Sequence, residues 1–266
     1  MRKILFSIAL CSSLFIISCQ KPNEDTPDLL VKTFYKSGSD SLVTLYTYNF
    51  SGKLENEKIS GYINGSTYSE EKQIYRNNAG IITRLETIYG GNSTSITVHY
   101  DATSSRYFSM APGYDNSGVR DSTVFIYDAA GRTIRKDIYR DIYNCCNYLS
   151  VRHEYAYDAA GNLAQRKLYT IQFPSGVANL ISTASFTSFD DKINPYKTDH
   201  EAFVIDRPDW ISPNNVTAMD GQFVNDPASN YTFNFAYTYN SNNFPIALVR
   251  TSVPPGIVGN VTFYYQ

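Results

Sequence analysis

The sequence predicts an all-β chain folded as an extended, twisted antiparallel β-meander, and three observations predict it. Tyrosine and phenylalanine are abundant, with 23 and 15 copies among 266 residues, and such residues favour pleated strands over helix interiors. Aromatic and small polar residues alternate along several stretches, as strands with one covered face require. A short motif also recurs every 25 to 32 residues, which is typical of stacked supersecondary units.

The first residues have the features of an export signal. Arg2 and Lys3 precede an apolar run, 4–17, that is shorter than the roughly 20 residues a membrane-spanning helix needs. The stretch Ile16–Cys19 resembles the lipobox of bacterial lipoproteins, in which the chain is cut before the cysteine and the thiol receives lipid. This resemblance implies a signal peptide over residues 1–18 and lipidation of Cys19. An ordinary signal peptide with a nearby cysteine is the alternative.

Residues 19–30 are expected to form a flexible tether, because the stretch from Lys21 to Asp28 contains two prolines and no apolar side chain. Gln20 stands where lipoproteins held in the inner membrane of many Gram-negative bacteria carry Asp, which implies the outer membrane. The charged start of the tether resembles surface-exported lipoproteins of Bacteroidetes-type bacteria. We therefore expect a lipid-anchored outer-membrane protein at the cell surface, with a periplasmic orientation as the alternative.

The remainder, residues 31–266, is expected to form one β-repeat domain. Its motif is an aromatic residue, Asp or Asn, two small residues and Gly, and its clearest copies are Tyr127–Gly131 and Tyr157–Gly161. The acid accepts backbone N–H hydrogen bonds, and the glycine takes the positive φ of a type I turn followed by a bulge. Each motif therefore predicts a hairpin tip. The predicted turn residues are Asp128, Gly131, Asp158 and Gly161.

This pattern resembles YD-repeat proteins, the β-meander units of Rhs-type wrapping proteins, and more closely uncharacterised Bacteroidetes-type lipoproteins with degenerate copies of that repeat. Two late segments, Phe189–Pro195 and Ser212–Val216, resemble motifs of those lipoproteins. The resemblance implies a fold and a cell-surface setting, and it implies no catalytic residues. The repeats are too few to enclose a toxin, so an encapsulating role does not follow.

Two stretches interrupt the alternation. Residues 196–230 are expected to form an irregular crossover segment with a short helical turn, and a functional loop on the sheet is the alternative. Cys145 and Cys146 are adjacent in a chain destined for an oxidising compartment. They suggest a vicinal disulfide, with two thiols at a hairpin tip or an intermolecular bridge as alternatives.

Chemical motifs argue against catalysis. The 25 acidic and 23 basic side chains lack the basic excess of nucleic-acid binders, so no nucleic acid is expected. His153-Glu154 and His200-Glu201 begin like a metalloprotease helix, but neither has a second histidine one turn later. The chain also lacks a nucleophile elbow, a phosphate loop and a dinucleotide fingerprint. We therefore expect no enzyme, no cofactor and no metal.

The surplus of tyrosine is the remaining functional hint. A solvent-facing aromatic row can stack on sugar rings, whereas a buried row is simply core. We expect a non-catalytic surface lipoprotein that is held on the membrane by its lipid and binds a glycan or an envelope protein. A structural spacer is the alternative, and a glycan hydrolase with acids from several tips is a third reading. The candidate ligand-binding residues are Tyr231, Phe233, Tyr237, Tyr239 and Trp210.

Overall fold

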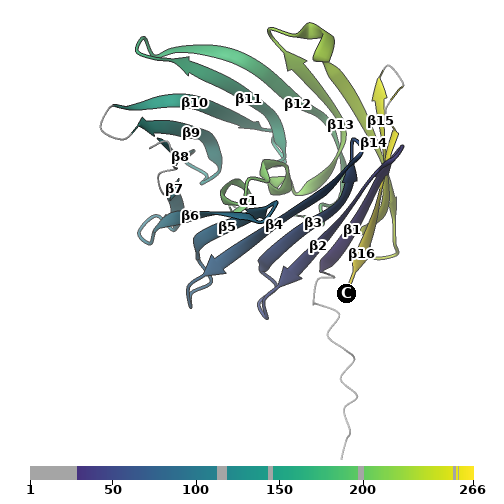
Figure 1. Ribbon diagram of the computed structural model, residues 1–266. Coiled ribbons are helices and arrows are strands. Elements are labelled where there is room, and N and C mark those ends of the chain that lie inside the picture. The colour runs from purple at the N-terminus through teal and green to yellow at the C-terminus, as the bar shows by residue number, and fades with distance from the viewer. Residues whose placement is uncertain (1–28, 113–118, 143–145, 197–200, 254–255, 257) are drawn as a thin grey trace, which may run out of the picture.

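The computed structural model describes residues 29–112, 119–142, 146–196, 201–253, 256 and 258–266, and within them sixteen antiparallel strands close into a barrel (Figure 1). Each strand pairs with the next one along the chain, and β1 pairs with β16. The strands are β1 Leu30–Ser37, β2 Asp40–Tyr48, β3 Leu54–Ile63, β4 Ser66–Arg76, β5 Ile82–Tyr89, β6 Asn92–Asp101, β7 Arg106–Pro112, β8 Val119–Tyr127, β9 Thr133–Ile142, β10 Cys146–Tyr157, β11 Leu163–Gln172, β12 Val177–Ile193, β13 Asn214–Phe223, β14 Tyr231–Tyr239, β15 Pro245–Val253 and β16 Val258–Tyr265.

The predicted open, extended meander is wrong, because the sheet closes on itself. The closing pair joins strands at the two ends of the domain, with Phe34 opposite Thr262 and the Ser37 hydroxyl donating to the Val258 carbonyl at 2.8 Å. Closure removes both sheet edges, which would otherwise expose unpaired backbone groups. The repeated motif reports only the pairing of neighbours, so it carried no information about this long-range contact.

The barrel has two rims of different construction. One rim, here called the motif rim, gathers the turns at 49–53, 77–81, 128–132, 158–162 and 240–244, together with Leu29 and Gln266, whose backbones hydrogen-bond to each other. The opposite rim joins strands through short hairpins such as those at 38–39, 64–65 and 90–91. The alternation follows from the meander, since every second connection returns to the same end of the barrel.

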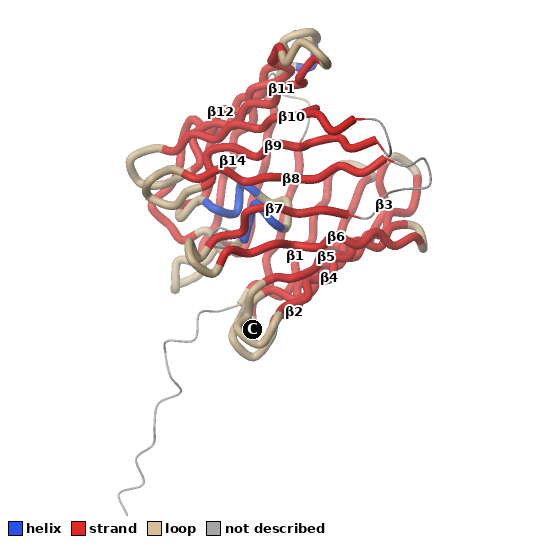
Figure 2. Tube along the Cα trace, turned by 90° about the vertical axis from the view of Figure 1, so that its left-hand side faces the viewer, coloured by secondary structure: helices blue, strands red, loops and turns tan. Residues whose placement is uncertain are grey.

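The predicted crossover over 196–230 is wrong, because β13 runs through the middle of it. The connection from β12 to β13 instead turns into the barrel, where α1 Glu201–Val204 and η1 Pro208–Ile211 lie within the ring of strands (Figures 1 and 2). We call residues 194–196 and 201–213 the plug. A barrel of this strand number encloses a wide lumen, and the plug fills part of it. A second short 3₁₀ turn, η2 Pro227–Ser229, lies at the opposite rim.

The outer wall of the barrel is charged. Lys72 and Lys136 contact the plug, so their sequence neighbours Glu71 and Asp137 point outward, because strand side chains alternate between faces. Asp137 is bound by Arg152 at 2.9 Å and by Arg135 at 3.1 Å on that outer face. Lys58–Glu71 and Arg120–Asp141 are further outer-wall pairs, at 3.7 and 2.6 Å. Among the described residues, no helix has the length and apolar character needed to cross a membrane.

Candidate ligand-binding pocket

Ion pairs and hydrogen bonds fasten the plug to the inner wall. Arg76 on β4 makes a bidentate pair with Glu201, at 2.7 and 2.8 Å. Arg207 pairs with Glu57 on β3, whose side chain is only 4% exposed, and the Nη2–Oε2 distance is 2.8 Å. Two further contacts are Lys136 Nζ to Asp206 Oδ1 at 2.9 Å and Lys72 Nζ to the Ile205 carbonyl at 2.8 Å.

Apolar packing adds to these charges. Ala202, Phe203, Val204 and Ile205 are all buried, and the Phe203 ring meets Tyr155 of β10 edge to face at 4.7 Å. Full burial of a valine, isoleucine or phenylalanine side chain, as in Val204, Ile205 and Phe203, stabilises a fold by about 1.5–3 kcal/mol each. The plug is therefore part of the core, and it fills the lumen near the motif rim.

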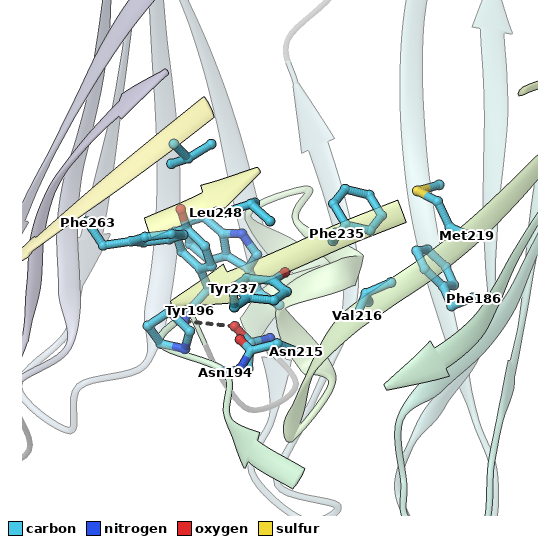
Figure 3. A pocket seen from close by; sticks show the side chains of 13 residues that line it. Phe186, Asn194, Tyr196, Asn215, Val216, Met219, Phe235, Tyr237, Leu248 and Phe263 are labelled. Carbon is cyan, nitrogen blue, oxygen red and sulfur yellow. Dashed lines mark hydrogen bonds between the residues drawn. The ribbon is translucent and has the colours of Figure 1, made fainter. Parts of the chain in front are cut away.

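An aromatic pocket of about 200 Å³ lies between the plug and the wall formed by β12–β16 (Figure 3). Tyr196 and Trp210 of the plug stack with their ring centres 5.0 Å apart, and both approach the Tyr46 ring edge to face at 6.1 Å. Tyr237 of β14 lines the same pocket, and so do Asn194 and Asn215 (Figure 3). The apolar lining is completed by Phe186, Pro195, Val216, Met219, Phe235, Leu248, Val261 and Phe263.

The polar groups near the pocket are held in place. Asn194 accepts the Tyr196 N–H at 3.0 Å and donates to the Ser212 carbonyl at 3.0 Å. The Asn215 amide donates to Asp190, which also accepts the hydroxyl of Tyr239. Within the described part of the chain the indole N–H of Trp210 has no acceptor. It is a donor that a ligand could use.

Burial raises the pKa of the tyrosine hydroxyls around the plug. The pKa of Tyr46 is raised to about 12, chiefly because burial disfavours the phenolate. Burial raises the pKa of Tyr196 well above its usual value for the same reason. Both side chains are therefore neutral at any physiological pH, and they act as aromatic surface and hydrogen-bonding groups.

The sequence-predicted ligand residues separate into three places. Tyr231, Phe233 and Tyr237 share the inner face of β14, where the Tyr231 and Phe233 rings lie 4.9 Å apart. Tyr239 follows a bulge and stacks with Tyr237 at 6.0 Å. Trp210 lies on the plug, 7% exposed. The structure brings Trp210 and Tyr237 together in the aromatic pocket, and it places Tyr231 in another cavity.

The predicted turn residues lie at the motif rim. The Asp128 carboxylate accepts the Arg132 N–H at 2.9 Å, and Asp158 accepts the Asn162 N–H at 2.8 Å. Gly131 and Gly161 have φ of +85° and +87°, the left-handed region that favours glycine. These four residues shape hairpins.

The motif tyrosines have a role that sequence reasoning missed. Tyr157 donates its hydroxyl to the Thr133 carbonyl at 2.7 Å, and Tyr48 donates to the Leu30 carbonyl at 2.8 Å. Tyr127 donates to the Tyr107 carbonyl in the same way, and Tyr265, which lies outside the repeated motif, donates to the Pro245 carbonyl. Each hydroxyl thus fastens the start of an earlier strand. The regular spacing of the tyrosines was the available signal, but it does not specify the acceptor.

Several sequence predictions fall partly or wholly outside the described residues. The signal peptide, Cys19 and most of the tether lie there, and so does Cys145. Cys146 is described and begins β10. The lipid anchor and the vicinal disulfide therefore stay predictions.

The fold has solved counterparts. A porin-like protein from Bacteroides uniformis has a TM-score of 0.55 and 11% identity, covering 90% of this chain and 98% of its own. One from Bacteroides vulgatus gives the same TM-score and identity, covering 90% and 99%. A Tc holotoxin pore from Photorhabdus luminescens gives a TM-score of 0.34 and 13% identity, covering 79% of this chain and 11% of its own, which is too low to carry an argument. No family model and no curated protein matches. The likeness shows the barrel fold alone.

Proposed function

We propose that this protein is a non-catalytic lipoprotein of the bacterial outer envelope whose barrel stands in water and binds one sugar ring of a glycan in the aromatic pocket. The observation that carries the proposal is the juxtaposition of Tyr237 with the stacked Tyr196–Trp210 pair. The envelope setting is supported by the lipobox-like Ile16–Cys19 and by the likeness in fold to Bacteroides proteins.

The outer wall supports a barrel that is held at the membrane without being embedded in it. A membrane barrel presents an apolar band to lipid, and an Arg or Lys at its midplane costs about 2–4 kcal/mol. Here Arg135, Asp137 and Arg152 form an ion-pair cluster on the outer faces of β9 and β10. The side chains of Tyr231, Phe233 and Tyr237 on β14 lie on the inner wall instead. This inside-out arrangement suits a barrel whose only lipid contact is the chain at Cys19.

The pocket suits a sugar ring for reasons of size and surface. Its volume of about 200 Å³ is below the roughly 300–1,000 Å³ of clefts that hold drug-sized ligands, so a single ring fits. Aromatic faces bind the C–H face of a sugar, and the Trp210 N–H can donate to a hydroxyl. The ligand would be sandwiched between Tyr237 and the plug.

The inner carboxylates support a non-catalytic role. Among the described side chains, the acids that meet the plug or belong to it are Glu57, Glu201 and Asp206, and each is bound to an arginine or a lysine. Their positions are explained by fastening the plug. A hydrolase would need one carboxylate left to donate or accept a proton at the sugar.

Binding can be followed through Trp210, because it is the only tryptophan in the sequence. Neutral mono- and oligosaccharides are titrated into the purified protein while its fluorescence is recorded. We expect a saturable change for at least one glycan, and a loss of affinity of tenfold or more in Tyr237→Ala. Thr238→Ala is the matched control, since the next side chain points to the outer face.

Two results would contradict the proposal. One is the absence of any fluorescence or calorimetric response across the glycan panel, which would favour a structural spacer. The other is equal affinity in Tyr237→Ala and Thr238→Ala, which would place the ligand elsewhere. Unchanged melting temperatures in both variants are needed to read either outcome.

A further inference from the structure

A second and larger cavity, of about 410 Å³, lies against the inner wall of β9–β14. It shares no lining residue with the aromatic pocket. Basic groups come from three neighbouring strands: Lys136 from β9, His153 from β10 and Arg166 from β11. Asp206 of the plug forms one side, and Phe223 and Tyr231 form the other.

The cations of this cavity outnumber its carboxylates. Lys136 is paired with Asp206 at 2.9 Å. Arg166 lies opposite Tyr155 on the inner face of the wall. Within the described ranges its guanidinium has no hydrogen-bond or ion-pair partner. A guanidinium presents a planar fork of donors that matches a carboxylate or a phosphate, so Arg166 is available to an anion.

His153 contributes a neutral polar group. Its Nδ1 is buried and has no hydrogen-bond partner in the described part of the chain. Burial, together with the positive charges of Lys136 and Arg166, lowers the pKa of His153 from 6.5 to about 4. The imidazole is therefore uncharged near neutral pH, and it can hydrogen-bond to a ligand without adding charge.

The other side of the cavity offers an aromatic face. Phe223 and Tyr231 lie 6.2 Å apart. The Tyr231 ring lies over Gly221, where an added Cβ would fall 2.1 Å from the ring. Gly221 therefore makes the room for this ring. On the plug side, Asp206 has φ of +61°, an unfavourable conformation for a residue with a side chain, and such strain is often found at binding sites.

We propose that this cavity binds a ring that carries a carboxylate, as in a uronic acid, with the carboxylate on Arg166 and Lys136 and the ring against Phe223 and Tyr231. The carboxylate would take over part of the pairing that Lys136 now makes with Asp206. The site is independent of the aromatic pocket, and it extends the proposed glycan binding from neutral to acidic sugars.

The test is calorimetric titration of the purified protein with glucuronate, with glucose as its uncharged counterpart, and with inorganic phosphate. We expect glucuronate to bind at least tenfold more tightly than glucose or phosphate. Arg166→Gln should remove this preference. Lys167→Gln is the matched control, because the neighbouring cation lies on the outer wall and its loss should change nothing.

The outcomes are distinct from those for the aromatic pocket. Equal binding of phosphate and glucuronate would overturn the carboxylate assignment, and so would an unchanged glucuronate affinity in Arg166→Gln. If Arg166→Gln does not fold, Arg166→Lys is used instead, because it keeps the positive charge and removes the paired donors of the planar guanidinium. That variant should then bind glucuronate more weakly than the original protein, and equal binding would overturn the proposal. Tyr237→Ala should leave glucuronate affinity unchanged.

Discussion

The two rims of the barrel are built from the same strands, yet they differ in almost every other respect. At the motif rim, Glu57 and Arg76 are buried in ion pairs with the plug. Toward the opposite rim, Arg140 and Asp121 form a pair that is 46% and 40% exposed. The difference shows that closing a barrel by strand pairing does not by itself fill its lumen. The plug supplies buried contacts near the motif rim, whereas the ion pair toward the opposite rim stays exposed.

The largest expected difference between the rims concerns core packing. Phe203→Ala should lower the free energy of unfolding by about 3–5 kcal/mol, because it leaves a cavity where a 2%-exposed ring packs on Tyr155. Val224→Ala at the opposite rim removes a side chain that is 53% exposed, so we expect less than about 0.5 kcal/mol. Urea unfolding followed by Trp210 fluorescence measures both. Similar losses would mean that the plug does not carry the core.

The ion pairs should differ in the same direction. Arg207→Ala leaves the buried Glu57 carboxylate without its partner, and we expect a loss of about 3 kcal/mol. Asp121→Ala breaks the exposed pair with Arg140 and should cost about 0–1 kcal/mol. Chemical denaturation at low and high salt distinguishes them, since only the exposed pair is screened. A small effect of Arg207→Ala would show that the plug is held by packing alone.

The pH dependence of stability should report His153. Its pKa of about 4 in the fold lies below the ordinary 6.5, so between pH 6.5 and 4 the unfolded chain binds a proton that the folded protein does not. The free energy of unfolding should therefore fall as the pH is lowered through this window, by about 2 kcal/mol after allowance for partial exposure of the ring. His153→Gln should remove this contribution in a series of melting curves. Parallel curves for both proteins would contradict the assignment.

The motif tyrosine should give the smallest effect. Tyr157→Phe removes the hydroxyl that satisfies the Thr133 carbonyl, and we expect a loss of about 0.5–1.5 kcal/mol. Tyr264→Phe is a suitable control, because that side chain is 43% exposed on the outer wall. Equal stabilities in both variants would remove the role of the hydroxyl in fastening the strand.

The strands and turns could be predicted from the sequence, whereas the closure of the sheet into a barrel could not. Alternation of Tyr231, Phe233 and Tyr237 reflects local pleating, and the Tyr127–Gly131 motif reflects local turn chemistry, so both were readable. The pairing of β1 with β16 was not, because no local pattern links residues such as Ser37 and Val258. The length of the chain between them carries no signal of closure.

Only part of the candidate site could be predicted from the sequence, for a similar reason. Tyr237 and Trp210 were named from their residue types, but their meeting depends on the plug entering the barrel. The three cations that bind the plug to the wall, Arg76, Lys72 and Arg207, cannot be told from ordinary surface charges in the sequence. Their partners are more than a hundred residues away, with |i−j| of 125, 133 and 150. Arg166 was missed because its isolation from carboxylates is a property of three dimensions.

The place where the chain enters the barrel has a consequence for orientation. Leu29 is bonded to Gln266 at the motif rim, with N···O distances of 3.3 and 3.1 Å. From Cys19, a tether of about ten residues reaches at most about 35 Å. If Cys19 carries the proposed lipid, the motif rim would lie on the side of the bilayer and the opposite rim would lie away from it. A ligand that approaches from the surrounding solution would then first contact the short hairpins at 38–39, 64–65 and 90–91.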